Sequence, residues 1–400
     1  MEDVFWKELG ESLCAPLYFS FSRWVESMVR EKGVKRILFL SREGSALLEA
    51  RRSLYPDSDV RSDYLLTSRR CVGIASMKEM GSEEIDFLLS GKYPVSLEGA
   101  FQRLGWDLSH FEGQAKAAGI TDSKALIETA EKRARFRRFI KFIEQDLLKL
   151  ISEERQAYLG YLKSLDLLQP AAGHVGLVDV GWRGSIQQSL QALLDSAGSS
   201  VRLHGFYLGT IAPVAPGVKD RASGLLFENS KPAQLLRTVK CSRELVELLF
   251  PSREPTLMRV AGQDSNPVYA DVHENRASLE HLMTMRDAAM RHLGEMASTW
   301  EKDPYEAMQQ AISRLSQLLR SPTPEESEKL GDLMWNDGFG NATRFNPVAR
   351  PGGYMINLPA MVRGYKDSYW RSGYLVRLGS FQRALISPFL KGMPVDRSGQ

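Results

Sequence analysis

Two stretches of this sequence combine acids, arginines and glycines in an order that suits a phosphorylated ligand. In the longer one, the apolar run 174–178 is typical of a buried strand and leads into Asp179. A turn with Gly181 and Gly184 follows, and a helix is expected from Ser185, a residue type that suits a helix N-cap. Glycines let backbone amides approach a ligand, and a helix N-terminus attracts phosphate. The alternative is an ordinary capped strand–loop–helix unit without a ligand.

The second stretch, SREGS at residues 41–45, follows the apolar run 36–40 and precedes another helix. Another expected strand, 60–67, leads into Ser68-Arg69-Arg70. Parallel strands joined by a helix have their carboxyl ends at one edge of the sheet, so these loops should meet there. One guanidinium group can bind two phosphate oxygens at once, and a carboxylate at a strand end can accept hydrogen bonds from sugar hydroxyls. The residues therefore predict a site for a ligand with several phosphates and a polyol.

A parallel α/β sheet is needed to position these loops, and the chain is long enough to bury its core. Further strands are expected over 201–208 and 224–227, and helices over 4–30, with a break near Pro16, and over 243–250. We divide the chain into the first half of an α/β core with an N-terminal helix (1–81), a helical insertion that covers the ligand edge (82–168), the second half of the core (169–260), and a helical C-terminal region with a basic aromatic tail (261–400).

Composition narrows the class of protein. A net charge of +3 does not indicate nucleic-acid binding, and no apolar run reaches membrane-spanning length. The three cysteines are far apart and the N-terminus is no signal peptide, so we expect a soluble protein of a reducing cytoplasm. Residues 341–400 hold nine Arg or Lys and two Asp, a local charge of +7, among many aromatic residues. This tail either faces a membrane surface or packs into the core, and packing is favoured.

A resemblance to a known family rests on these same motifs. The stretch LVDVGWRGSI resembles the phosphoribosyl pyrophosphate (PRPP) motif of phosphoribosyltransferases, and LFLSREGS resembles their pyrophosphate-binding loop. The usual PRPP motif has a second acid where this chain has Val180, and a turn one residue longer. With a later Tyr-Leu-x-x-Ser-Arg-Arg and ELLF, the order is similar to phosphoribosyltransferase modules of bacterial cell-surface polysaccharide clusters, over about residues 1–255.

The resemblance implies a type I phosphoribosyltransferase-like, Rossmann-like parallel sheet and a specific reaction. Such an enzyme transfers 5-phosphoribosyl from PRPP, bound with Mg²⁺, to a hydroxyl of a lipid-linked glycan and releases pyrophosphate. A HAD-type phosphatase then removes the 5-phosphate and leaves ribofuranose. No DxDx(T/V) motif of such a phosphatase follows a strand here, so a partner is expected to supply that step, at the cytoplasmic face of the membrane.

The resemblance also implies roles for individual residues. The catalytic residues would be Asp179, Glu43 and Glu247; the pyrophosphate-binding residues Ser41, Arg42, Gly44, Ser45, Arg69 and Arg70; and the 5-phosphate-binding residues Gly181, Trp182, Arg183, Gly184 and Ser185. Any general base would be Glu43, Asp63, Glu244 or Glu247, and no protein metal site is visible.

Several of these residues have a second interpretation. Glu43 either holds magnesium through water or stabilises a helix dipole, and Trp182 is either a core residue or a platform for an acceptor sugar. One of Arg69 and Arg70 is expected in a structural salt bridge, and His174 and His204 are expected in the core.

Two other functions stay open on the sequence alone. The missing second acid allows a non-catalytic module that binds PRPP or a nucleotide. A nucleotide-sugar glycosyltransferase is disfavoured because no DxD motif follows an expected strand; the triplet Asp57-Ser58-Asp59 precedes one.

Overall fold

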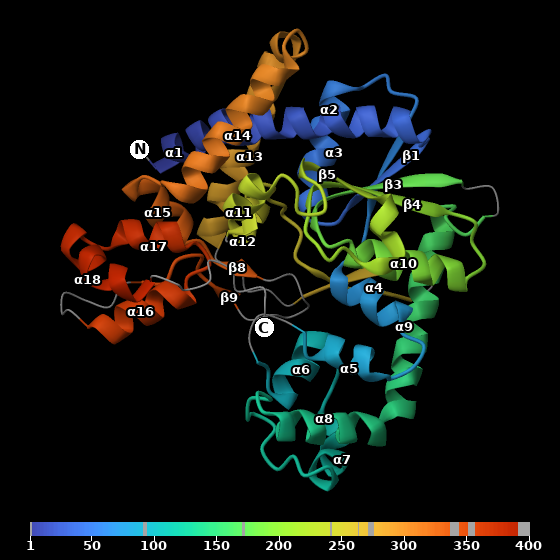
Figure 1. Cartoon of the computed structure of the whole chain (residues 1–400). Helices are drawn as coiled ribbons and strands as arrows, with labels where there is room; N and C mark the ends of the chain where they lie inside the picture. The colour runs from blue at the N-terminus through green and yellow to red at the C-terminus, as the bar shows by residue number, and fades with distance from the viewer. Residues whose placement is uncertain are drawn as a thin grey trace.

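The computed structural model describes residues 2–90, 94–169, 173–240, 242–262, 264–270, 276–336, 344–350 and 357–390. Its centre is a five-stranded sheet in which every neighbouring pair is parallel, in the order β2-β1-β3-β4-β5 (Figure 1). The strands are β1 (Arg36–Leu40), β2 (Arg61–Leu65), β3 (His174–Trp182), β4 (Arg202–Thr210) and β5 (Ala222–Phe227). All five expected strands and the α/β class are confirmed.

The strand order reverses beside β1. The chain moves outward from β1 to β2 and then returns to the other side of β1 to form β3. Crevices at such a reversal, outside the carboxyl ends of the strands, are where open α/β sheets bind ligands. The loops after β1 and β3 flank this position.

Helices cover both faces of the sheet because alternate strand residues point to opposite sides. Ile37 and Phe39 join a core with α2 (Ala15–Lys32) and α3 (Glu43–Leu54). Leu38 joins the opposite core with α4 (Arg69–Ser76), α9 (Glu144–Ser164) and α10 (Ser185–Ser196). The near-continuous apolar strands of the sequence therefore reflect burial on both faces.

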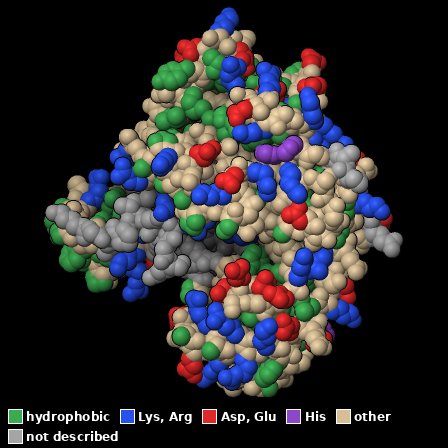
Figure 2. Space-filling model, turned by 45° about the vertical axis from the view of Figure 1, so that its right-hand side comes forward, with side chains coloured by type: hydrophobic (Ala, Val, Ile, Leu, Met, Phe, Trp, Pro, Cys, Tyr) green, Lys and Arg blue, Asp and Glu red, His purple; other side chains and the backbone are tan. Residues whose placement is uncertain are grey.

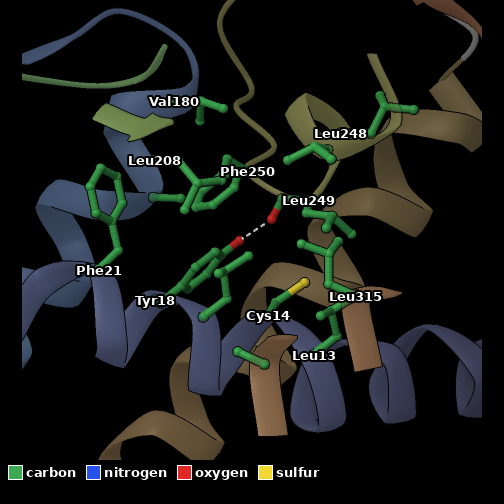
Figure 3. Close-up of a cluster of buried hydrophobic side chains, with 14 of the residues drawn as sticks. Leu13, Cys14, Tyr18, Phe21, Val180, Leu208, Leu248, Leu249, Phe250 and Leu315 are labelled. Atoms are coloured by element: carbon green, nitrogen blue, oxygen red, sulfur yellow. Dashed lines mark hydrogen bonds between the residues drawn. The ribbon is translucent and has the colours of Figure 1, made fainter. Parts of the chain in front are cut away.

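The N-terminal helical region was expected to break near Pro16. Its irregular turn lies just before that residue. Helix α1 (Glu2–Leu9) passes through a π-helical turn (Gly10–Cys14) into α2, and Pro16 lies in the first turn of α2, where its missing N–H is tolerated. A Cβ atom on Gly10 would lie 2.2 Å from the carbonyl oxygen of Met285, so glycine allows α13 (Arg276–Trp300) to cross closely. Figure 3 shows the core beside this turn, where the Tyr18 hydroxyl donates to the Leu249 carbonyl.

The insertion is helical, as expected. Its elements are α5 (Ser82–Leu88), α6 (Leu97–Leu104), a 3₁₀ turn (Ser109–Phe111), α7 (Glu112–Ala117), α8 (Ala130–Phe142) and α9. Phe101, Phe136 and Phe139 form part of a separate core, and the insertion forms a lobe below the sheet (Figure 1) with a hollow between lobe and body (Figure 2). Its long helix α9 packs on α4, the helix that follows β2.

The C-terminal part contains strands that were not expected. After the 3₁₀ turn Pro216–Arg221 and β5 come α11 (Ala233–Lys240), α12 (Arg243–Leu248), the antiparallel pair β6 (Leu257–Ala261) and β7 (Asn266–Tyr269), α13, α14 (Pro304–Arg320), α15 (Pro324–Gly331), the short pair β8 (Trp335–Asn336) and β9 (Arg344–Phe345), α16 (Leu358–Asp367), α17 (Arg371–Arg377) and α18 (Ser380–Leu390). Helices α13 and α14 pack on the N-terminal helices and extend the core on that face of the sheet.

The aromatic tail divides between core and surface. Tyr369, Trp370 and Tyr374 are buried, as the packing interpretation predicted, whereas Phe381 and Phe389 on α18 are exposed. Tyr354 lies outside the described residues. None of the helices in the described ranges is long and apolar enough to cross a membrane.

The described cysteines form no disulfide. Cys14 and Cys71 are both free and buried, while Cys241 lies outside the described residues. Burial raises the pKa of each described thiol to about 12, so these thiols stay protonated and inert.

Candidate functional site

The loop after β3 is shorter than expected because the strand is longer. Strand β3 continues to Trp182, since its partner β4 is equally long and Asp179 still pairs with Tyr207 in the ladder. Asp179 therefore lies within the strand and not after it. Helix α10 begins at Ser185, but its N-cap is Gly184 and no side chain caps it, so the expectation of a Ser185 cap is wrong.

Both glycines of this loop have a structural reason to be glycine. Gly181 has φ +131°, and a Cβ atom there would lie 2.5 Å from the carbonyl oxygen of Gly209. Gly184 has φ +69°, in the left-handed region that favours glycine. Arg183 and Ser185 are exposed, so this loop offers a guanidinium, a hydroxyl and the first amides of α10 to a ligand.

Arg42, in the loop after β1, has a strained backbone. Its φ of +72° and ψ of −101° lie outside the regions that a residue with a side chain ordinarily adopts. Such residues cost about 1–3 kcal/mol and persist where their surroundings hold them, commonly at binding sites. Here the Arg42 amide donates to the Tyr64 hydroxyl at 2.8 Å, and that hydroxyl donates to Glu254 at 2.6 Å. The guanidinium lies 3.4 Å from the Thr256 hydroxyl oxygen.

Tyr64→Phe is therefore expected to loosen this loop. Burial and the neighbouring Glu254 carboxylate raise the pKa of Tyr64, so its hydroxyl stays protonated and bonds both groups. Removing the hydroxyl leaves the Arg42 amide and Glu254 without this partner, which costs about 1–3 kcal/mol. We expect faster amide hydrogen exchange over residues 41–45, measured by mass spectrometry.

Tyr158→Phe is the matched control for that measurement. The Tyr158 hydroxyl is also buried and donates to the Leu66 carbonyl at 3.0 Å, but it has no contact with Arg42. Unchanged exchange over residues 41–45 in Tyr64→Phe, or an equal increase in Tyr158→Phe, would show that Tyr64 does not hold Arg42.

Three carboxylates gather beside these loops. Asp179 comes from β3, Glu43 is the first residue of α3, and Glu247 comes from α12. Glu43 lies 3.3 Å from the Arg42 guanidinium. The Trp182 indole N–H donates to Glu247 at 2.9 Å. The three predicted catalytic acids thus lie at one edge of the sheet.

Burial and mutual repulsion make two of these acids hard to ionise. The pKa of Asp179 is raised to about 8, first by burial and then by the charges of Glu43 and Glu247, against hydrogen bonds from the Val180 and Gly181 amides. The pKa of Glu247 is raised to about 7 by burial and Glu43. Near neutral pH the site therefore holds protons that an entering positive charge would displace.

Trp182 is a core residue, as one interpretation predicted, and it also positions an acid. Its ring is buried and stacks on Phe227, with centroids 6.0 Å apart and planes 8° apart. This packing fixes the direction of the indole N–H and so places Glu247 at the site. A role as a sugar platform has little support, because only 7% of Trp182 is exposed.

Several predicted pyrophosphate ligands make internal contacts. The Ser41 hydroxyl donates to the Leu65 carbonyl and accepts from the Thr67 amide, which ties the end of β1 to the end of β2. A Cβ atom on Gly44 would lie 2.9 Å from the backbone of Phe39, so Gly44 is required for packing. The Ser45 hydroxyl accepts from Arg286 of α13 at 2.9 Å. These residues shape the loop that carries Arg42.

Arg69 and Arg70 have opposite environments. Arg69 is exposed at the start of α4. Arg70 is fully buried, forms an ion pair with Glu154 and donates to the carbonyls of Leu104 and Met258. Arg70 is thus the structural arginine of the pair, and we remove it from the proposed ligand-binding residues.

The remaining candidates for a general base are Asp63 on β2 and Glu244 on α12. Asp63 lies mid-strand and pairs with Arg36 at 2.7 Å and Arg61 at 2.8 Å, so it is committed to those cations. Glu244 is half-buried one helical turn before Glu247 and raises the pKa of Glu247.

The two strand histidines are not core residues, contrary to expectation. His174 is exposed, and its Nδ1 lies 2.8 Å from Nε2 of His204. Both belong to the amino-terminal halves of β3 and β4, away from the acids. The reason is that the sheet's amino-terminal edge is open to solvent at this point.

Tyr64, the tyrosine of the Tyr-Leu-x-x-Ser-Arg-Arg motif, was given no role by the sequence analysis, and three residues around the site loops were missed altogether. The three are Glu254, Thr256 and Arg286. Among them, Arg286 also bonds Glu49 at 2.5 Å and joins α13 to α3. Their residue types and spacing give no signal, because each reaches the site from a distant part of the chain.

No family model matches this chain, and no curated protein matches it significantly. Among the described residues, no three His, Cys, Asp or Glu side chains form a group that could hold a metal ion.

Proposed function

We propose that this protein is a phosphoribosyltransferase with a type I-like fold, which transfers 5-phosphoribosyl from PRPP to a hydroxyl of a glycan and releases pyrophosphate. The observation that carries the proposal is that the two loops resembling the pyrophosphate and PRPP motifs flank the strand-order reversal between β1 and β3. A ligand with phosphates at both ends of a ribose needs two anion-binding loops, one for each end. The adjoining carboxylates supply groups for the sugar between them.

Each loop would bind one end of PRPP. Arg42, with the amide of Gly44, would bind pyrophosphate, and exposed Arg69 lies at the start of the neighbouring helix α4. Arg183, Ser185 and the first amides of α10 would bind the 5-phosphate, because a helix N-terminus favours an anion.

The raised pKa values suit a reaction that passes through a positively charged sugar. As the bond to pyrophosphate breaks, positive charge develops on the ribose ring. Asp179 would release its proton to solvent as that charge develops, and its carboxylate would then stabilise the positive charge on the ring. Glu247, with a pKa of about 7, would accept the proton of the acceptor hydroxyl. The bond from C1 to pyrophosphate breaks and a bond from C1 to the acceptor oxygen forms.

The residues present fit magnesium bound to the substrate. Carboxylate oxygens are the ligands that Mg²⁺ prefers, usually through water, and Glu43 and Asp179 could bind those waters. When bound, the metal would neutralise charge on the departing pyrophosphate. Removal of the product's 5-phosphate would need a separate HAD-type phosphatase, and the acceptor would be a lipid-linked glycan at the cytoplasmic face of the membrane.

Thermal stabilisation by PRPP tests the donor. We expect PRPP with Mg²⁺ to raise the melting temperature, and UDP-glucose, GDP-mannose and NAD to leave it unchanged; a ligand at about 100 times its Kd adds about 2.7 kcal/mol. Arg42→Ala should abolish the effect. The control Arg202→Ala, at the opposite edge of the sheet, should not.

The outcomes separate the alternatives. Stabilisation by a nucleotide sugar and not by PRPP would reject the proposal in favour of a sugar-nucleotide glycosyltransferase. Stabilisation by PRPP without pyrophosphate release in the presence of a membrane glycan fraction would reject catalysis in favour of a binding module.

A further inference from the structure

Helices α16 and α18 form an outlying pair in the C-terminal region (Figure 1). Between them lies a groove of about 520 Å³ with apolar walls that include Leu358, Val362 and Phe389. Two cations, Arg363 and Lys366, and one acid, Asp367, line the same groove. The groove thus combines apolar surface with positive charge.

Helix α18 exposes a stripe of apolar side chains. Phe381 is 64% exposed and Phe389 51% exposed, and Leu385 is half-buried between them. Residues four apart lie on the same side of a helix, so the three form one stripe. Exposed phenylalanines of this kind mark a surface that meets another apolar phase.

The surroundings of this stripe are basic. The described stretch 357–390 contains five Arg or Lys and one acid, Asp367. Three of these cations are exposed: Arg363, Lys366 and Arg383. Arg377 instead forms an ion pair with Asp332 at 2.9 Å. On the left of Figure 2, where this region projects, hydrophobic and basic side chains lie together on the surface. Cations beside exposed aromatic residues match an anionic lipid surface.

We propose that α16 and α18 seat the protein on an anionic membrane. Phe381 and Phe389 would enter the boundary between headgroups and acyl chains, and Arg363, Lys366 and Arg383 would contact the headgroups. The helices would lie on the membrane and not cross it, because no described helix is long and apolar enough to span one. This inference adds to the proposed function that the enzyme meets its lipid-linked acceptor at this face.

Sedimentation of the full chain with vesicles tests the proposal. We expect binding to vesicles containing phosphatidylglycerol and not to phosphatidylcholine alone. Binding should weaken from about 0.1 M to about 1 M salt, where the Debye length falls from about 10 to about 3 Å. The double variant Phe381→Ser/Phe389→Ser should bind at least about tenfold more weakly, since two exposed apolar side chains are lost.

Helix α8 supplies matched controls. It is also basic and carries Phe142, which is 54% exposed. Phe142→Ser and Arg138→Glu should leave vesicle binding unchanged, whereas Arg363→Glu/Lys366→Glu should weaken it. All these side chains are exposed, so the variants should keep the melting temperature of the parent chain.

Four results would overturn the proposal. The first three are no binding to anionic vesicles, equal binding to neutral vesicles, and equal loss of binding from the α8 and α18 variants. A fourth is a wild-type dimer that Phe381→Ser/Phe389→Ser converts to a monomer, which would make this face a contact between copies. None of these measurements uses PRPP, so failure here is distinct from failure of the proposed reaction.

Discussion

Asp179→Asn is expected to abolish pyrophosphate release and at the same time to stabilise the folded protein at alkaline pH. The carboxylate lies beside Glu43 and Glu247, with a pKa raised to about 8. Asparagine keeps the size of the side chain and removes the charge. We expect at least about a hundredfold loss of turnover, the scale seen when one group that stabilises transition-state charge is removed.

The direction of the stability change follows from the proton balance. Between the ordinary pKa of 3.8 and about 8, the folded state keeps a proton that the unfolded state has lost. The free energy of unfolding therefore falls as the pH rises through this window, by up to about 1.4 kcal/mol per pH unit. Below pH 3.8 this loss of stability is absent, and above about pH 8 it has reached its full size. Asparagine avoids it, so the melting temperature of the variant should exceed that of the parent most at about pH 9.

Asp63→Asn is the control with the opposite sign. The Asp63 carboxylate is paired with Arg36 and Arg61, so losing its charge should destabilise the protein and leave pyrophosphate release unchanged. Melting curves at about pH 5 and about pH 9, with turnover at each, measure both effects. An Asp179→Asn protein that is less stable at high pH, or fully active, would show that Asp179 is an ordinary paired side chain.

The sheet and its edge could be predicted from the sequence because they depend on local signals. Apolar runs of strand length, each followed by glycine or serine and a helix, place the loops at 41–45 and 179–185 on one edge. The length of β3 could not be predicted, since it depends on the partner β4, and Gly181 looks like a turn residue until its approach to Gly209 is known.

Distant contacts decided the roles that the sequence left open. Arg69 and Arg70 are adjacent and identical in type, but only Arg70 meets Glu154 and Met258, 84 and 188 residues away. Tyr64 likewise reaches Glu254 across 190 residues. Such pairings come from how α9 and the segment after α12 pack on the sheet, which no spacing within a motif encodes.

The second large effect is expected at the buried pair of Arg70 and Glu154. Arg70 is fully buried, and its guanidinium bonds Glu154 at 2.8 Å. Glu154→Gln would leave a buried cation without its counter-charge, which costs about 3–5 kcal/mol. The free energy of unfolding, from urea titration, should fall by this amount.

Asp86→Asn gives the matched control, since it breaks the exposed pair of Arg137 and Asp86 at 2.9 Å and should cost less than about 1 kcal/mol. The double variant Arg70→Met/Glu154→Leu should recover most of the stability, because both charges leave together.

Turnover in that double variant decides what Arg70 does. If Arg70 only joins α4 to α9 and β6, the double variant folds and still releases pyrophosphate from PRPP. If Arg70 reaches the ligand in the working enzyme, stability recovers while the KM for PRPP rises. The first outcome is expected, because the Arg70 guanidinium is bonded by the carbonyls of Leu104 and Met258 and by the Glu154 carboxylate. Arg42 and Arg69 then remain the arginines at the edge where pyrophosphate is proposed to bind.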